Sequence, residues 1–114
     1  MINRTQKGKR IERLLEIKLK EKGFLVHKAT SNMFNRNDIW GCFDHMAKDP
    51  VSPDSTFYFQ VSTQWKYGKA RQEIEAFPRG RYDRIFMARK PDRKPFEFKE
   101  MTGSQWIDLR LETL

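Results

Sequence analysis

The clearest hydrophobic pattern of the chain lies near its N-terminus. Between Gly8 and Lys22, apolar residues recur at the spacing of a helix with one buried face, and Lys and Glu fill most other positions. These apolar residues are Ile11, Leu14, Leu15 and Leu19. Gly23 follows, as glycine often does where a helix ends. The pattern predicts an amphipathic helix over Gly8–Lys22.

The next part of the chain has the pattern of strands. Aromatic, aliphatic and β-branched residues are enriched in Phe24–Ala29, Ile39–Lys48 and Thr56–Ser62. The polar stretch "TSNMFNRND" separates the first two segments, and the turn-forming stretch "DPVSPDS" separates the last two. We therefore expect the second and third strands to form a hairpin.

The C-terminal half predicts one more helix and further strands. The helix spans Gly68–Phe77 and is ended by Pro78, which cannot donate a backbone hydrogen bond. A short strand, Tyr82–Ala88, follows, and "PFEFKEMT" indicates another, while "SQWIDLRLETL" fits either a strand or a short helix. No internal repeat is evident. We expect residues 1–114 to form one α/β domain with a mixed sheet.

Composition narrows the function classes. The chain has 23 Lys and Arg against 15 Asp and Glu, a net charge of +8. Clustered positive charge is typical of nucleic-acid binders, although a basic protein with no such ligand is the alternative. No apolar run approaches the roughly 20 residues of a membrane span. The single cysteine, Cys42, excludes an internal disulfide, so we expect a cytoplasmic protein without a membrane segment.

Two polar residues in neighbouring strands are candidates for chemistry. Asp44 lies in an otherwise apolar segment, where a carboxylate is costly unless it is paired or binds a metal. Because side chains alternate along a strand, Gln60 and Ser62 share one face, opposite to Phe57, Phe59 and Val61. The hairpin can bring Asp44 beside Gln60. Carboxylate and amide oxygens are suitable ligands for Mg²⁺.

Glu12 offers a third oxygen ligand. It borders the buried stripe of the first helix, so a helix packed on the sheet can direct it toward Asp44. The alternative is a solvated carboxylate that pairs with nearby Lys and Arg side chains. The sequence alone leaves both open.

These segments together resemble the PD-(D/E)XK nuclease superfamily. The resemblance covers roughly residues 8–88 through "GKRIERLLEIKLKEKGFLV", "NDIWGCFD" and "FYFQVST", and is strongest to archaeal Holliday junction resolvases and related small phage and archaeal nucleases. It implies a restriction-endonuclease-like core, with a mixed central sheet flanked by helices. It also implies a homodimeric endonuclease that uses Mg²⁺ or Mn²⁺ and acts on DNA, with branched or junction DNA as the favoured substrate.

The family motif comprises an acid in the first helix, an aspartate in the second strand and Glu-x-Lys in the third. Glu12 matches the helix acid, and Asp44 matches the aspartate within Gly-x-Phe-Asp. The chain departs from the motif at the third strand, where Gln60-Val61-Ser62 replaces Glu-x-Lys. Gln60 retains a carbonyl oxygen but has no charge, and Ser62 has no ammonium group.

Two hypotheses follow from this departure. In the first, the protein is an active variant in which Lys66 or Lys69 supplies the missing cation. Its metal ligands are then Asp44, Gln60, the backbone carbonyl of Val61 and Glu12, and its catalytic residues are Glu12, Asp44, Gln60 and Ser62. In the second, catalysis is lost and the fold serves as a nucleic-acid-binding module or an accessory subunit. Whether one or two metal ions act is left open.

Basic and aromatic residues beyond the third strand are candidates for nucleic-acid contact. The cations are Lys66, Lys69, Arg71, Arg79, Arg81 and Arg84, with a second basic loop of Arg89, Lys90, Arg93 and Lys94. Ser31 and Arg36 of the polar loop are further candidates. Trp65 and Tyr67 can stack on unpaired bases, although core packing explains Trp65 equally well. His45 is expected on the face opposite to Asp44, and Phe86, Trp106 and Ile107 in the core.

Overall fold

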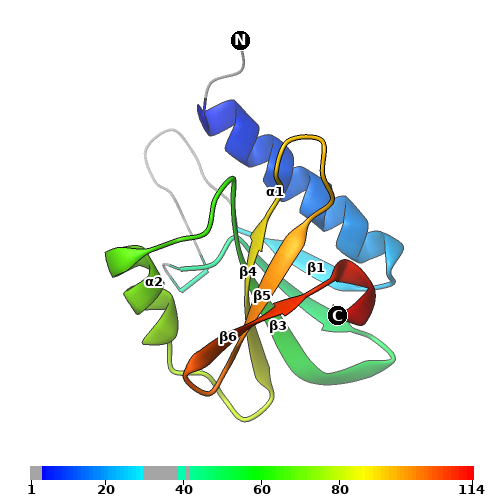
Figure 1. Ribbon diagram of the computed structural model, residues 1–114. Coiled ribbons are helices and arrows are strands. Elements are labelled where there is room, and N and C mark those ends of the chain that lie inside the picture. Colours follow the sequence, from blue (N-terminus) through cyan, green and yellow to red (C-terminus); the bar gives the residue numbers. More distant parts are fainter. Residues whose placement is uncertain (1–3, 30–38, 41) are drawn as a thin grey trace.

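The fold is a six-stranded sheet with helices packed on its two faces (Figure 1). The computed structural model describes residues 4–29, 39, 40 and 42–114, with side chains from residue 8 onward. The elements are α1 Arg4–Glu21, β1 Leu25–Lys28, β2 His45–Asp49, β3 Ser52–Ser62, α2 Gly68–Glu75, β4 Asp83–Arg89, β5 Glu97–Thr102, β6 Gln105–Leu109 and the 3₁₀ helix η1 Leu111–Thr113.

The strands follow their sequence order across the sheet. Strands β3 and β4 are parallel, and all other neighbouring strands are antiparallel. The single parallel pair arises because α2 crosses over between β3 and β4. The predicted α/β class with a mixed central sheet is confirmed.

Helix α1 covers one face of the sheet. Its residues Ile11, Leu15 and Leu19 are buried, as the hydrophobic pattern predicted. They pack against alternate residues of the central strands, namely Phe57, Phe59, Val61, Phe86 and Ala88. The helix starts earlier than the predicted Gly8 and ends at Glu21, and Gly23 follows with a φ of 95°.

The other face is covered by α2 and by the segment before β2. Ile74 of α2 is buried there with Tyr58, Ile85 and Met87, the residues that alternate with the α1-facing set. Strands β3 and β4 are therefore apolar on both faces over their central part, as expected for buried parallel strands. Gln60 is the polar exception on β3.

The predicted strand Ile39–Lys48 is wrong in its first half. Ile39 and Phe43 form an isolated bridge and exchange two backbone hydrogen bonds of 2.8 and 3.0 Å. This tight reversal includes Trp40 in a left-handed conformation with a φ of 56°. Strand β2 begins only at His45, so Asp44 lies immediately before the strand rather than inside it.

The hairpin between β2 and β3 is tighter than predicted. Strand β3 begins at Ser52, and Asp49 pairs with Ser52 across the turn. The Asp49 carboxylate accepts a 3.0 Å hydrogen bond from the Val51 backbone. This side-chain bond stabilises a turn of two residues. The last four residues of the predicted turn "DPVSPDS" belong to β3 instead.

The C-terminal segment forms both alternatives that its sequence allowed, since β6 is followed directly by η1. Phe86 is buried and Trp106 is half-buried, but Ile107 is 45% exposed, so its predicted core position is wrong. Ile107 lies on β6, an edge strand with one pairing neighbour. None of the helices in the described part of the chain is long and apolar enough to span a membrane.

Candidate metal and nucleic-acid site

Asp44 and Gln60 come together in the structure, as the hairpin predicted. Both are nearly buried, at 5% and 6% exposure. A carboxylate oxygen of Asp44, Oδ2, accepts a 2.7 Å hydrogen bond from the backbone N–H of Val61. The Asp44 backbone N–H donates in turn to the Phe59 carbonyl at 2.9 Å. These two bonds fix the carboxylate against β3 at the position of Gln60.

The Gln60 amide is only half satisfied. Its Nε2 donates to the Val61 carbonyl at 3.2 Å, but no described residue donates to its buried Oε1. An unsatisfied buried acceptor costs about 1–3 kcal/mol and calls for a ligand or a water. Together with the Asp44 carboxylate and the Val61 carbonyl, this oxygen belongs to a donor set of the kind that Mg²⁺ and Mn²⁺ prefer.

The charge of this donor set is low. Asp44 contributes one negative charge and Gln60 contributes none. Across the described residues, no group of three or more His, Cys, Asp or Glu side chains gathers at a metal-binding distance. The donor types therefore fit a divalent cation, and the charge fits weak binding.

Helix α1 is attached to β2 beside Asp44. The Nε2 of His45 lies 2.7 Å from the backbone carbonyl of Glu12. Because a carbonyl only accepts, Nε2 carries a proton. Burial lowers the pKa of His45, and the smaller opposing effects of the Glu12 hydrogen bond and of Asp44 do not offset it. His45 is therefore neutral near pH 7 and faces α1, opposite to Asp44, as predicted.

Glu12 is positioned through its backbone. The backbone carbonyl of Glu12 contacts His45, the residue that follows Asp44. The Glu12 side chain is half-buried. The convergence of the Glu12 carboxylate with Asp44 and Gln60 stays a prediction.

The residues that leave β3 are partly engaged in local structure. The Ser62 hydroxyl donates to the backbone carbonyl of Gln64 in the turn after the strand. Lys66 precedes α2 and Lys69 lies in its first turn, at the same end of β3 as Gln60. Both lysines therefore belong to the end of the sheet that carries the candidate site.

Three predicted phosphate-binding arginines lie at the other end of β3. Thr56 there pairs with Asp83 at the start of β4. Arg79 donates to the Met101 carbonyl at 2.6 Å, and Arg81 lies over the Tyr82 ring at 5.5 Å. The expected basic surface is thus divided between two ends of the sheet. Ser31 and Arg36 lie outside the described residues.

Arg84 is engaged by a carboxylate, contrary to the expectation that it holds phosphate. It makes two 2.8 Å hydrogen bonds to Glu100, which raise its pKa. Its guanidinium also lies 4.7 Å and 5.2 Å from the ring centroids of Phe57 and Phe86. A paired and stacked arginine of this kind joins β4 to β5 and covers the core.

The sequence did not indicate which cations lie beside the rings of Trp65 and Trp106. Arg89 and Lys99 lie 4.8 Å and 5.2 Å from the Trp65 ring centroid, and Arg71 lies 5.8 Å from that of Trp106. The register explains the grouping, because Ser62 pairs with Arg89 and Met87 pairs with both Gln60 and Lys99. Only the strand pairing reveals this neighbourhood.

Comparison with known proteins gives a structural likeness. No protein-family model matches the sequence, and a search of curated proteins finds no match. The fold is similar to the solved structure of Hjc, a Holliday junction resolvase from the archaeal hyperthermophile Archaeoglobus fulgidus. The TM-score is 0.58 over 87% of this chain and 85% of that chain, with 21% sequence identity. The chain has a resolvase-like fold.

Proposed function

We propose that this protein is a metal-dependent endodeoxyribonuclease that hydrolyses phosphodiester bonds in branched DNA. The observation that carries the proposal is the buried Asp44 carboxylate beside the unsatisfied oxygen of Gln60. The fold shared with the resolvase Hjc and the net charge of +8 support it. Both point to DNA as the substrate class.

In this proposal, Asp44, Gln60 and the Val61 carbonyl hold Mg²⁺ or Mn²⁺. A bound divalent cation lowers the pKa of water and neutralises charge on the phosphate. Glu12 orients the attacking water, and Lys66 or Lys69 holds the phosphate in place of the missing motif lysine. A homodimer, also proposed, would match the two-fold symmetry of a four-way junction.

The second candidate function is a nucleic-acid-binding module without catalysis. The hydrogen bond of the Ser62 hydroxyl to the Gln64 carbonyl favours it, because the position of the motif lysine then serves only the turn. The low charge of the donor set points the same way. A water molecule would then satisfy Gln60.

Cleavage of defined DNA substrates tests the proposal. The protein is incubated with four-way junction, flapped, single-stranded and duplex DNA in Mg²⁺ or Mn²⁺. Asp44→Asn is the informative variant, because an amide oxygen still accepts from Val61 while the charge is lost. We expect cleavage to fall by roughly 100-fold or more, since losing several kcal/mol of charge stabilisation slows a reaction by at least two decades.

Asp49→Asn is the matched control. Asp49 also accepts a backbone hydrogen bond, but it lies at the other end of β2 from Asp44. It should cleave like the unmodified protein. Tight, salt-sensitive binding without cleavage in either metal would support the binding module instead. Failure to bind any nucleic acid at low salt would exclude both functions.

A further inference from the structure

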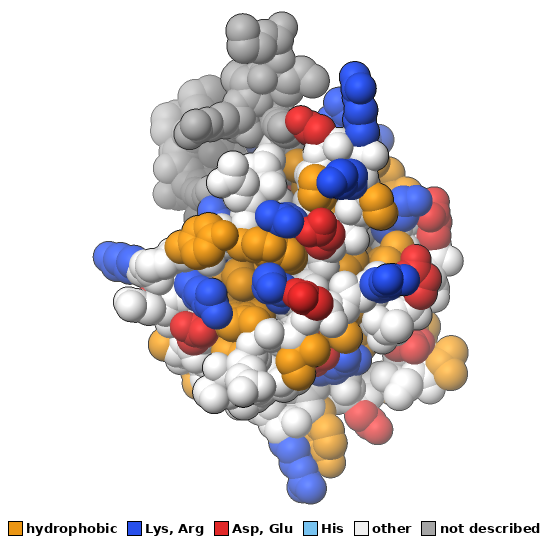
Figure 2. All heavy atoms as spheres, viewed as in Figure 1, with side chains coloured by type: hydrophobic (Ala, Val, Ile, Leu, Met, Phe, Trp, Pro, Cys, Tyr) orange, Lys and Arg blue, Asp and Glu red, His pale blue; other side chains and the backbone are white. Residues whose placement is uncertain are grey.

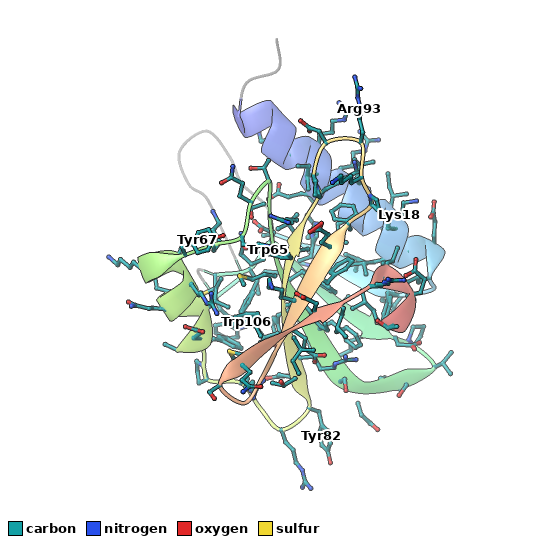
Figure 3. All side chains as sticks on the ribbon, in the orientation of Figure 1. Lys18, Trp65, Tyr67, Tyr82, Arg93 and Trp106 are labelled. Carbon is teal, nitrogen blue, oxygen red and sulfur yellow. The ribbon has the colours of Figure 1, made fainter. Side chains whose placement is uncertain are left out.

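Three aromatic side chains form a second feature near the candidate site. Trp65 and Tyr67 come from the connection between β3 and α2, and Trp106 comes from β6. Figure 3 shows all three on the same side of the molecule. Tyr67 is 68% exposed, and the two tryptophans are half-buried. We name Trp65, Tyr67 and Trp106 the aromatic shelf.

Cations contact the members of the shelf. Lys99 lies 5.2 Å from the Trp65 ring, and its neighbour across β6, Asp108, is two residues from Trp106. Arg71 lies 5.8 Å from the Trp106 ring, and its backbone N–H donates to the Tyr67 carbonyl. The Trp106 Nε1 donates to Glu75 of α2 at 2.9 Å. Arg71 therefore contacts both Trp106 and the backbone of Tyr67, and Lys99 lies beside Trp65.

The Trp65 part of the shelf lies close to Gln60. Gln60 pairs with Met87, and Met87 pairs with Lys99, so these three side chains share one face of the sheet. With about 4.8 Å between neighbouring strands, the backbone of Lys99 is roughly 10 Å from that of Gln60. A strand of nucleic acid on the shelf would therefore pass next to the candidate metal site.

Core packing explains only part of the shelf. Trp65 and Trp106 pack against the cluster of Tyr58, Ile74 and Met87, which gives them a structural role. Tyr67 has no such role, because it is largely exposed. Figure 2 shows hydrophobic side chains on this face with Lys and Arg side chains, and some Asp and Glu side chains, around them.

The charge around the shelf is positive after its ion pairs are counted. Three of its cations pair with carboxylates at 3.5 Å or less, in Arg71–Glu75, Arg89–Glu97 and Lys99–Asp108. Lys66, Lys69 and Lys90 lie nearby, and no carboxylate in the described part of the chain pairs with them. Trp65 also lines an open groove of about 1450 Å³ that includes Lys18, Lys90 and Arg110. Flat rings beside unpaired cations suit a ligand with both bases and phosphates.

We propose that the aromatic shelf binds an unpaired stretch of nucleic acid. Bases stack on Tyr67 and on the exposed part of Trp65, and the phosphates contact Lys66, Lys69 and Lys90. An acidic peptide without aromatic residues or a lipid surface would supply negative charge but no flat rings. The inference rests on the proposed function in that the ligand is a nucleic acid, and it adds that the substrate has a single-stranded part beside the cleaved bond.

Binding without divalent cations tests the inference apart from catalysis. With EDTA present, the affinities for a short oligothymidylate and for an abasic deoxyribose-phosphate chain of the same length are measured by fluorescence anisotropy. The protein should prefer the oligothymidylate. Tyr67→Ala should weaken its binding roughly 5- to 150-fold, the range measured for loss of one aromatic–base stack, and should leave abasic binding nearly unchanged.

Tyr82→Ala is the matched control. Tyr82 is 56% exposed and also lies beside an arginine, but it precedes β4 at the far end of the sheet (Figure 3). Its affinities should equal those of the unmodified protein. Oligothymidylate should also quench tryptophan fluorescence in a Trp40→Phe background, since Trp40 lies outside the shelf beside Phe77.

The outcomes separate this inference from the proposed function. Equal affinity for the two chains, no effect of Tyr67→Ala, or equally tight binding of a polyglutamate peptide would each overturn the inference. Cleavage of junctions by Tyr67→Ala at the normal rate and affinity would overturn the shelf and leave the nuclease. Tyr67-dependent binding by a protein that never cleaves DNA would support the shelf and overturn the nuclease.

Discussion

At the scale of single residues, Gln60 is the most informative position. Its amide is buried on a strand whose other central residues are apolar, and only its nitrogen has a partner in the described part of the chain. Burying a polar atom without a partner destabilises the fold, so the residue needs a compensating role. Gln60 and Asp44 both hydrogen-bond to the backbone of Val61, Gln60 at the carbonyl and Asp44 at the N–H. Cation binding is therefore the role that we propose for Gln60.

Gln60→Glu tests this role through stability. Without a divalent cation, a second buried carboxylate beside Asp44 should destabilise the fold by about 2 kcal/mol, or roughly 5–10 °C in Tm. Mg²⁺ or Mn²⁺ at about 100 times its Kd should restore about 2.7 kcal/mol. Thermal unfolding with and without the cation measures both effects.

Gln64→Glu is the control for Gln60→Glu, because its side chain is exposed in the turn after β3. It should change Tm little and respond to the cation as the unmodified protein does. A Gln60→Glu protein that is equally stable with and without the cation would exclude metal binding at this position.

His45 should make the fold sensitive to acid. Its pKa is lowered on folding, so the unfolded chain binds the proton more readily. The stability that neutral His45 contributes is complete above its unfolded pKa of about 6.5 and is lost as the pH falls toward the lower folded value. The loss should reach up to about 1.4 kcal/mol per pH unit in that window.

Urea unfolding at about pH 7.5 and about pH 5 checks the acid sensitivity. His45→Gln retains an N–H that can donate to the Glu12 carbonyl, so it should fold and lose much of the pH dependence. His27→Gln changes the other histidine, which lies on β1, and should keep the pH dependence. Equal pH profiles for all three proteins would show that His45 does not carry the effect.

At the scale of elements, α1 is the best-defined unit. Its buried stripe and its glycine ending follow from residues close together in the sequence, whereas its contact to His45 joins residues 33 positions apart. Gly23 has a φ of 95°, and its amide donates to the Lys20 carbonyl at 2.9 Å. Only glycine adopts this conformation without strain.

Two alanine substitutions in this helix should have opposite effects. Gly23→Ala should destabilise the fold by about 1–2 kcal/mol, because alanine is strained at positive φ. Gly8→Ala should stabilise it by about 0.5–1 kcal/mol, because Gly8 lies within the helix. A methyl group meets no atom within 4 Å at either position, so backbone conformation decides both signs. Urea unfolding measures them, and two changes of the same sign would contradict the argument.

The strand boundaries show where sequence patterns were insufficient. The apolar residues Ile39 and Phe43 have strand-like character, yet a tight reversal through Trp40 pairs them with each other. In the opposite direction, Pro53 and Asp54 indicate a turn, yet both belong to β3. The outer part of β3 tolerates Pro53 because no residue of β2 or β4 lies in register with it, so its missing N–H removes no ladder hydrogen bond.

At the scale of the whole molecule, positive charge is divided over two ends of the sheet. Lys66, Lys69, Trp65 and Tyr67 lie at the end that carries Gln60, and Arg79 and Arg81 lie at the other, where Arg79 bonds to Met101, the strand partner of Trp106. Arg84 forms an ion pair with Glu100, which offsets its positive charge. We therefore expect nucleic acid to contact mainly the end with the candidate site.

Salt dependence distinguishes the two ends. Each lysine that contacts a phosphate of single-stranded DNA contributes about 0.7 to the slope of log affinity against log salt. Lys66→Gln should lower the slope by about that amount. Lys48→Gln should not, since Lys48 lies at the far end of β2 and donates to the Pro53 carbonyl. Equal slopes for both variants would place the contact elsewhere.

The sequence by itself determined the elements whose signals are local. The period of Ile11, Leu15 and Leu19 specifies a helix with one buried face, and the surroundings of Asp44 specify a carboxylate that needs a partner. The alternation around Gln60 specifies its face. The resemblance carried by Glu12 and Asp44 indicated the fold, because the order and spacing of those residues are themselves sequence properties.

Only the tertiary structure decided which distant residues meet. The bond between Asp44 and the Val61 backbone, the unsatisfied Gln60 oxygen and the position of Lys99 beside Trp65 all depend on strand register. A shift of one residue would turn each side chain to the other face. Register is set by packing and turn geometry over the whole sheet, so no single segment encodes it.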